Sequence, residues 1–122
     1  MNIVQLERNG EIIAQVETEE TLMTDVQSTL DLMATVRYET GADRVILPKT
    51  ALGERFFVLS SGLAGDILQK FVNYQLKVAI VGDYSGYTSK PLRDFIYESN
   101  NGSHVFFVVT VEEALEKLSR AK

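Results

Sequence analysis

"LKVAIVG", residues 76–82, is the stretch that decides the fold class. It is short, rich in Val and Ile and closed by a glycine, which favours a β-strand. Its centre, "VAIV", does not alternate with polar residues, and such a run is typical of a strand buried on both faces of a parallel sheet. "HVFFVV", residues 104–109, is a second run of this kind. Parallel strands joined by helices are therefore expected.

A helix is expected on either side of the 76–82 strand, and another after the last strand. Residues 90–100 carry Pro91 in the first turn, where its missing N–H costs nothing. Thr110 and Glu113 form the capping-box pattern at the start of the final helix. The apolar stripe of the helix before the strand consists of Leu63, Ile67, Leu68 and Phe71.

The chain opens with a predicted β-hairpin. "NIVQLER" (residues 2–8) and "EIIAQVE" (residues 11–17) flank Asn9-Gly10. This dipeptide is the strongest short hairpin signal, because a type I′ turn needs positive φ at both central residues. The first strand must then be antiparallel to the second, since a two-residue turn allows no other pairing.

A further helix is predicted between the hairpin and a short strand at residues 44–47. Thr18 or Thr21 is the predicted cap at its start, and Gly41 is predicted to end it. Residues 48–59 are predicted to form one helical turn or a loop. The core-facing side of the helix is predicted to carry Leu22, Val26, Leu30, Met33, Ala34 and Arg37.

This element order predicts a single α/β domain over residues 1–122, in which β-α repeats follow the hairpin and the five-stranded sheet is mixed. Right-handed crossovers that all step the same way put every helix on one face of the sheet. The apolar strands then need a cover on the other face. The hairpin or one helix that crosses over are two alternatives, and a second copy of the chain is the third. We expect a homodimer that buries part of the sheet face or the Phe56-Phe57 segment.

The composition excludes several classes of partner and chemistry. There are 17 acidic and 12 basic residues, a net charge of −5, so nucleic acid is a poor partner, because phosphate binding needs clustered Lys and Arg. The absence of cysteine excludes disulfides, thiolate metal sites and thiol catalysis, and it fits a reducing cytoplasm. No apolar run is long enough to span a membrane, and the N-terminus is not that of a signal peptide. We expect a cytoplasmic protein without membrane contact.

"SSGLAGDILQKF" begins with a candidate anion or phosphorylation site at Ser60, Ser61 and Gly62. A helix N-terminus offers free N–H groups and about half a positive charge to an anion. The structural interpretation is that Ser60 or Ser61 caps the helix by accepting one of these N–H groups. The two interpretations are compatible.

The loop after residue 82 is a candidate ligand site, because ligands of open α/β sheets bind beyond the carboxyl ends of the strands. The alternative is a capped loop, in which Ser89 caps the next helix and Asp83 bonds the local backbone. Tyr87 stands where a P-loop needs its second glycine, and His104 lacks an adjacent nucleophile and orienting partner. No catalytic set, metal site or cofactor is predicted. The candidate residues are Asp83, Tyr84, Ser85, Tyr87, Thr88, Ser89 and Lys90.

The element order resembles that of STAS domains, the fold of anti-sigma-factor antagonists. Their signature is a loop that reads like Asp-Ser-Ser-Gly-Leu and opens a helix. Residues 60–63, Ser-Ser-Gly-Leu, match the last four positions, and the resemblance implies Ser60 as the phosphoacceptor. Leu59 departs from the pattern, because it stands where the acid should be.

A resemblance that covers nearly the whole chain is to the bacterial domain-of-unknown-function family 4180. It rests on "GLAGDILQKF", "VAIVGDYSGYTSKPLRDFIYESNNG" and "VEEALEKL". The resemblance implies a bacterial cytoplasmic protein and supplies no activity or substrate.

Three functions are compatible with these patterns. The first is a non-enzymatic regulatory or protein-interaction module, switched by phosphate on Ser60 or Ser61. The second is a small-ligand or lipid carrier with a pocket near residues 54–59. The third is a minor enzyme that uses Asp83, Ser85 and Lys90.

Overall fold

The structure, a computed structural model, describes residues 1–122. Three short 3₁₀ helices, η1 (Lys49–Ala51), η2 (Glu54–Phe57) and η3 (Leu59–Ser61), follow the third strand. The strands are β1 (Asn2–Arg8), β2 (Glu11–Glu17), β3 (Arg44–Pro48), β4 (Lys77–Val81) and β5 (Val105–Val108), and the α-helices are α1 (Val26–Thr40), α2 (Leu63–Asn73), α3 (Lys90–Asn100) and α4 (Val111–Arg120).

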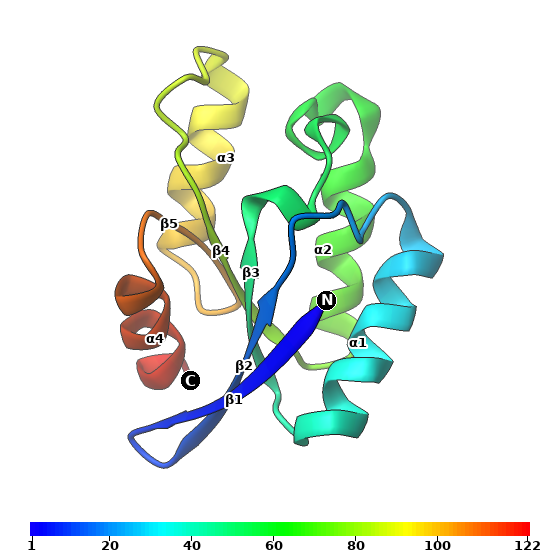
Figure 1. The fold of residues 1–122 in the computed structure, drawn as a ribbon. Coiled ribbons are helices and arrows are strands. Elements are labelled where there is room, and N and C mark those ends of the chain that lie inside the picture. Colours follow the sequence, from blue (N-terminus) through cyan, green and yellow to red (C-terminus); the bar gives the residue numbers. More distant parts are fainter.

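The five strands form one mixed sheet in the sequential order β1-β2-β3-β4-β5 (Figure 1). β1 is antiparallel to β2, and all other neighbours are parallel. Asn9 and Gly10 have φ of 55° and 80°, the positive values that a type I′ turn requires. The predicted fold class, with its hairpin, β-α repeats and antiparallel first strand, is confirmed.

The helices cover both faces of the sheet. Side chains of α1, α2 and α3 join the larger core of 23 buried residues, whereas α4 contributes Ala114 and Leu118 to a second cluster of seven buried residues on the opposite face. Figure 1 shows α4 and the pair α1 and α2 on opposite sides of the sheet. The predicted one-sided arrangement is therefore wrong. Crossover handedness constrains only helices that connect two parallel strands, and α4 follows the last strand.

The two surfaces that were predicted to form a homodimer are buried within one chain, the sheet face by α4 and the Phe56-Phe57 pair in the larger core. On the α4 side of the sheet, Ile13, Ile46 and Ala79 are fully buried within one chain. Phe56 and Phe57, the other predicted surface, are 0% and 5% exposed. A homodimer would have to use a different surface.

The helix α1 begins later than predicted and faces the core with different residues. Its N-cap is Asp25, not Thr18 or Thr21, because the N–H groups of Leu22 and Met23 both donate to the Ala51 carbonyl (2.9 Å each) and hold that segment extended. Gly41 ends the helix with φ of 71°, as predicted. The buried residues of the helix are Thr29, Leu32, Met33 and Val36. Of the predicted stripe, Met33 is buried and Leu22 and Leu30 pack against the core while partly exposed, whereas Ala34 and Arg37 are exposed, so the predicted stripe is only partly correct.

The other helices follow the predictions more closely. All four predicted stripe residues of α2 are buried, and the segment between β3 and α2 consists of single 3₁₀ turns that deliver Phe56 and Phe57 to the core. Thr110 Oγ1 caps α4 by accepting the Glu113 N–H (3.1 Å), while the Glu113 carboxylate accepts from Val109 rather than Thr110.

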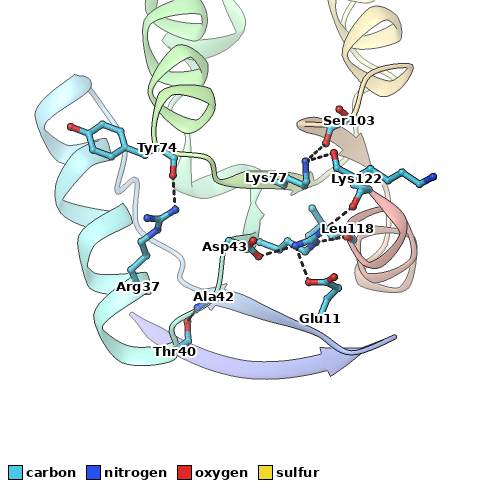
Figure 2. A network of polar contacts seen from close by, with 12 residues as sticks. Glu11, Arg37, Thr40, Ala42, Asp43, Tyr74, Lys77, Ser103, Leu118 and Lys122 are labelled. Atoms are coloured by element: carbon cyan, nitrogen blue, oxygen red, sulfur yellow. Dashed lines mark hydrogen bonds and ion pairs between the residues drawn. The ribbon is translucent and has the colours of Figure 1, made fainter.

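A buried arginine at the start of β3, Arg44, ties α4 to the sheet. Figure 2 labels three of its partners, Glu11, Asp43 and Leu118. The Arg44 side chain is 8% exposed. It donates to the carbonyls of Leu118 (2.7 Å) and Ala121 (2.8 Å) and forms ion pairs with Glu11 (3.0 Å) and Asp43 (2.8 Å). Its guanidinium thus satisfies carbonyls at the C-terminal end of α4, which have no partner within the helix.

Candidate functional site

The predicted ligand loop lies at the carboxyl edge of the sheet and is fixed by its own side chains. The Asp83 carboxylate accepts hydrogen bonds from the backbone N–H of Ser85 (2.9 Å) and from its hydroxyl (2.7 Å). The Ser85 hydroxyl and N–H favour the charged form, so they lower the pKa of Asp83, and Lys49 lowers it further. A carboxylate stabilised in this way is a weaker base than an unperturbed one.

The two tyrosines of the loop point into the protein. The Tyr84 hydroxyl donates to the Ile80 carbonyl (2.6 Å), and burial raises the pKa of this phenol. The Tyr87 ring stacks on Phe57 at a centroid distance of 5.1 Å, and its hydroxyl donates to Glu54 (3.3 Å). These contacts anchor the loop to η2.

Lys49, which the sequence interpretation missed, lies among these rings. Its ammonium is 4.4 Å from the centroid of Tyr87, 5.2 Å from Phe57 and 5.8 Å from Tyr84, and it donates to the Asp83 carbonyl (3.2 Å). A cation over aromatic faces is attracted by their quadrupoles. The stem of the lysine passes over Gly82, where an added Cβ would lie 2.6 Å from Lys49 Cβ. The glycine is therefore needed for close approach.

The remaining loop residues lie apart from this aromatic cluster. Ser89 Oγ accepts the Leu92 N–H at 3.5 Å, so Ser89 caps α3 as predicted. Lys90 is exposed and pairs with Asp94 at 2.6 Å. Thr88 is exposed, and so is His104, whose ring lies 3.3 Å from the Ser103 hydroxyl at the opposite end of the sheet. Of the three residues proposed for catalysis, Asp83 and Ser85 are hydrogen-bonded to each other, but no hydrogen bond or ion pair joins Lys90 to either of them.

The two serines before α2 differ in their contacts. Gly62, in the left-handed conformation with φ of 77°, occupies the N-cap position, so the prediction that Ser60 or Ser61 stands there is wrong. Ser61 Oγ accepts the Leu63 N–H (3.2 Å) and donates to the Arg55 carbonyl (3.0 Å). Ser60 is exposed and its hydroxyl makes no hydrogen bond. Of the two, only Ser60 presents a free hydroxyl.

An apolar hollow between α1 and the end of α2 is the second candidate site, and no motif pointed to it. Its volume is about 250 Å³. The hollow lies at the amino end of the parallel strands, where Figure 2 shows Arg37 of α1 reaching the Tyr74 carbonyl. Arg37 is exposed and forms no ion pair. The lining residues are Leu30, Met33, Ala34, Arg37, Tyr74 and Leu76.

The α1 side of this hollow is the stripe that the sequence interpretation assigned to the core. Leu30, Ala34 and Arg37 belong to that predicted stripe, and the true core residues lie beside it on the helix. Exposed aromatic groups extend the apolar surface, because Tyr38 is 92% exposed one turn beyond Ala34 and Tyr74 is 51% exposed. A helix with apolar residues on two adjacent stripes was the available signal for this surface.

Comparison with known families then assigns the chain. A family model described as domain of unknown function (DUF4180) matches residues 8–118. The chain belongs to this family. The matched range of the DUF4180 domain runs from the end of β1 into α4 and includes both candidate sites. No curated protein matches the chain. None of the helices of this DUF4180 domain has both the length and the apolar character needed to cross a membrane.

Proposed function

We propose that this DUF4180 domain is a non-enzymatic module that binds a protein partner through the hollow between α1 and α2. The observation that carries the proposal is an apolar depression lined by an exposed tyrosine, Tyr74, and by Arg37, which forms no ion pair. Tyr, Met and Arg are enriched in protein interfaces, and Tyr and Arg in their hot spots.

The size of the hollow favours a protein side chain over a small molecule. Ligand sites enclose roughly 300–1,000 Å³ and bury most of the ligand. The hollow holds about 250 Å³, below this range. This space suits one large apolar side chain that a partner inserts as an anchor.

Arg37 defines the polar part of the partner. One of its guanidinium nitrogens donates a hydrogen bond to the Tyr74 carbonyl. A guanidinium carries five N–H donors, so others remain for a partner. A carboxylate on the partner, next to the apolar anchor, would form a charge-assisted pair with it. The partner is therefore a protein segment that combines a large apolar residue with an acidic one.

The two alternative functions have less support. Near residues 54–59, Phe56 and Phe57 fill the core, and the adjacent groove is polar, with Glu54, Lys49 and Thr50 among its walls. An enzyme at the carboxyl edge would use Ser85 and Lys90, which are engaged with Asp83 and Asp94.

Regulation by phosphate on Ser60 is part of the proposal, together with a bacterial cytoplasmic location and a STAS-like fold. The free hydroxyl of Ser60 two residues before the N-cap of α2 supports it, because a helix N-terminus favours negative charge. Ser61 is a poorer acceptor, since its hydroxyl is used twice in local hydrogen bonds.

The test compares proteins retained by wild-type and variant domains from extracts of the source organism. Ala34→Arg places a long charged side chain in the hollow, whereas Gln27→Arg changes an exposed residue of α1 outside it. We expect a partner that binds wild type and Gln27→Arg and loses at least about tenfold in affinity for Ala34→Arg, a loss typical of an interface hot spot. Isothermal titration with the purified partner measures this loss.

Two results would contradict the proposal. Equal binding of the partner to all three proteins would place its site elsewhere. A small molecule that native mass spectrometry finds on wild type but not on Ala34→Arg would identify the hollow as a ligand site. The same spectra report a phosphate mass on Ser60, with Ser60→Ala as the control.

A further inference from the structure

The two edges of the sheet differ in how their outward backbone groups are used. On β5, the Asn100 side chain donates to the Phe107 carbonyl (3.1 Å) and accepts the Phe107 N–H (2.7 Å). It thus occupies both backbone groups of that residue. The next outward N–H, that of Val109, donates to Glu113 (3.5 Å). This edge is closed to another strand.

The outward backbone groups of β1 have no such cover. Arg8 lies opposite Glu11 across the two-residue turn, and hydrogen-bonded pairs alternate from there along the hairpin. The backbone groups of Ile3, Gln5 and Glu7 therefore point away from β2, and none of them bonds to a loop, cap or side chain. β1 also lacks proline, lysine and a bulge, the devices that usually protect an edge.

The side chains of β1 are also incompletely covered. On the face that α4 occupies, α4 packs against β2, β3, β4 and β5. Leu6 of β1 packs against the apolar cluster of α4. The side-chain hydrogen bonds from the β1 end of the hairpin to α4 lie near the turn, from Arg8 to Glu112 and from Asn9 to Ser119. Val4 and Leu6, on the same face of β1, remain half-buried. The β1 edge of the sheet therefore has partly exposed apolar side chains as well as unpaired backbone groups.

We propose that β1 pairs antiparallel with β1 of a second copy of the chain, about a twofold axis at Gln5. This register pairs all seven residues of the strand. It sets Val4 opposite Leu6 of the partner, Ile3 opposite Glu7 and Asn2 opposite Arg8, so apolar residues meet on the α4 side and no like charges face each other.

The sequence of the strand selects a second copy over another protein. Moving the axis to Leu6 would set Gln5 against Glu7 and run the partner strand into the turn at Asn9, and moving it to Val4 would set Asn2 against Leu6. The self-pairing register alone uses the whole strand, and twofold homodimers are the commonest oligomers. This dimer uses neither surface expected from the sequence, and it shares no residue with the hollow.

Single-cysteine variants test the register directly, because the chain has no cysteine. In the proposed dimer Gln5 faces itself across a hydrogen-bonded pair, at a Cα separation near 5.5 Å that a disulfide spans. Glu7 is about 14 Å along the strand from its equivalent. Under mild oxidation, Gln5→Cys should form a covalent dimer and Glu7→Cys should not.

The oligomeric state is measured on wild type, Gln5→Pro and Gln5→Thr by light scattering and sedimentation. Proline removes an N–H that faces away from β2, a position where edge strands tolerate it. We expect dimers of wild type and Gln5→Thr and a monomer of Gln5→Pro, with circular dichroism showing that each variant is folded. A monomeric wild type at high concentration, a Gln5→Pro dimer or equal cross-linking of both cysteine variants would overturn the inference.

Discussion

Ser60 and Ser61 are adjacent residues of the same type, but their hydroxyl groups have different roles in the structure. Both precede α2, and their sequence context is nearly identical. Only Ser61 is turned toward the chain, where it bridges the Arg55 carbonyl and the Leu63 N–H. The Ser60 hydroxyl makes no hydrogen bond, because its neighbour provides the local ones.

Replacing each serine by alanine separates these roles. Ser61→Ala should lower the free energy of unfolding by about 1 kcal/mol, the usual net contribution of intramolecular hydrogen bonds. Ser60→Ala should stay within about 0.5 kcal/mol of wild type, as is typical of exposed residues without contacts. Urea denaturation measures both. The reverse order would mean that the two hydroxyls have exchanged roles.

At the scale of single elements, α1 shows how a cap and a packing face are chosen. Asp25 and Ser28 form a capping box, because the side chain of each residue accepts a hydrogen bond from the backbone N–H of the other. The cap sets where the helix starts, and the bonds of Leu22 and Met23 to the Ala51 carbonyl fix the chain just before it. The stripe with Leu32 and Val36 enters the core, and the stripe with Leu30 and Ala34 is left to line the hollow.

The cap predicts a pH dependence of stability. The Ser28 backbone N–H, and then its side chain, lower the pKa of Asp25 in the folded protein. A group with a lowered folded-state pKa stabilises the protein above its unfolded value, near 3.9, and this stabilisation is lost as the pH falls through the folded value. Asp25→Ala should therefore lower the midpoint of denaturation at neutral pH.

The difference between wild type and Asp25→Ala should then shrink below about pH 4, where the wild-type carboxylate protonates. Thr24→Ala is the matched control, because Thr24 is exposed and its hydroxyl makes no hydrogen bond. Thermal melts over a pH series provide the measurement. A difference that stays constant down to the lowest pH would show that the carboxylate charge does not contribute.

The whole molecule depends on how α4 is held against the second face. Leu118 and Ala114 bury the apolar side chains of the central strands, while Arg44 orders the C-terminal end of the helix and connects it to β2 through Glu11. The contact joins the last helix to the first hairpin. Without α4, that face of the sheet would be exposed to solvent.

Arg44→Ala tests this link. Removing one partner of a buried charge network costs about 3–5 kcal/mol, and the half-exposed Glu11 and Asp43 carboxylates can be rehydrated, which favours the lower end. Arg93→Ala, on the exposed side of α3, should stay near wild type. Denaturation gives the free energies, and hydrogen exchange should show the largest loss of protection in α4. Equal loss in all helices would indicate that Arg44 supports the core in general.

Features that depend on local spacing follow from the sequence alone. The Asn9-Gly10 turn, the strands at β3, β4 and β5, the stripe of α2 and the caps Ser89 and Thr110 all follow from residues close together in the chain. Handed crossovers then leave few ways to order the parallel strands. The fold class followed from these signals alone.

Contacts between elements settle the features for which the local sequence pattern allows two arrangements. The phase of α1 depended on the bonds that Leu22 and Met23 make to Ala51, twenty-eight or more residues away. The position of α4 depended on a bare sheet face and on Arg44, because no following strand constrained the helix. The contacts of the Lys49 ammonium with Phe57, Tyr84 and Tyr87 join residues from three separate segments. The phase of α1, the position of α4 and the contacts of Lys49 have a common physical cause. A local sequence pattern sets the backbone conformation of one element. The burial of apolar area and the pairing of buried charges depend on how different elements pack against each other.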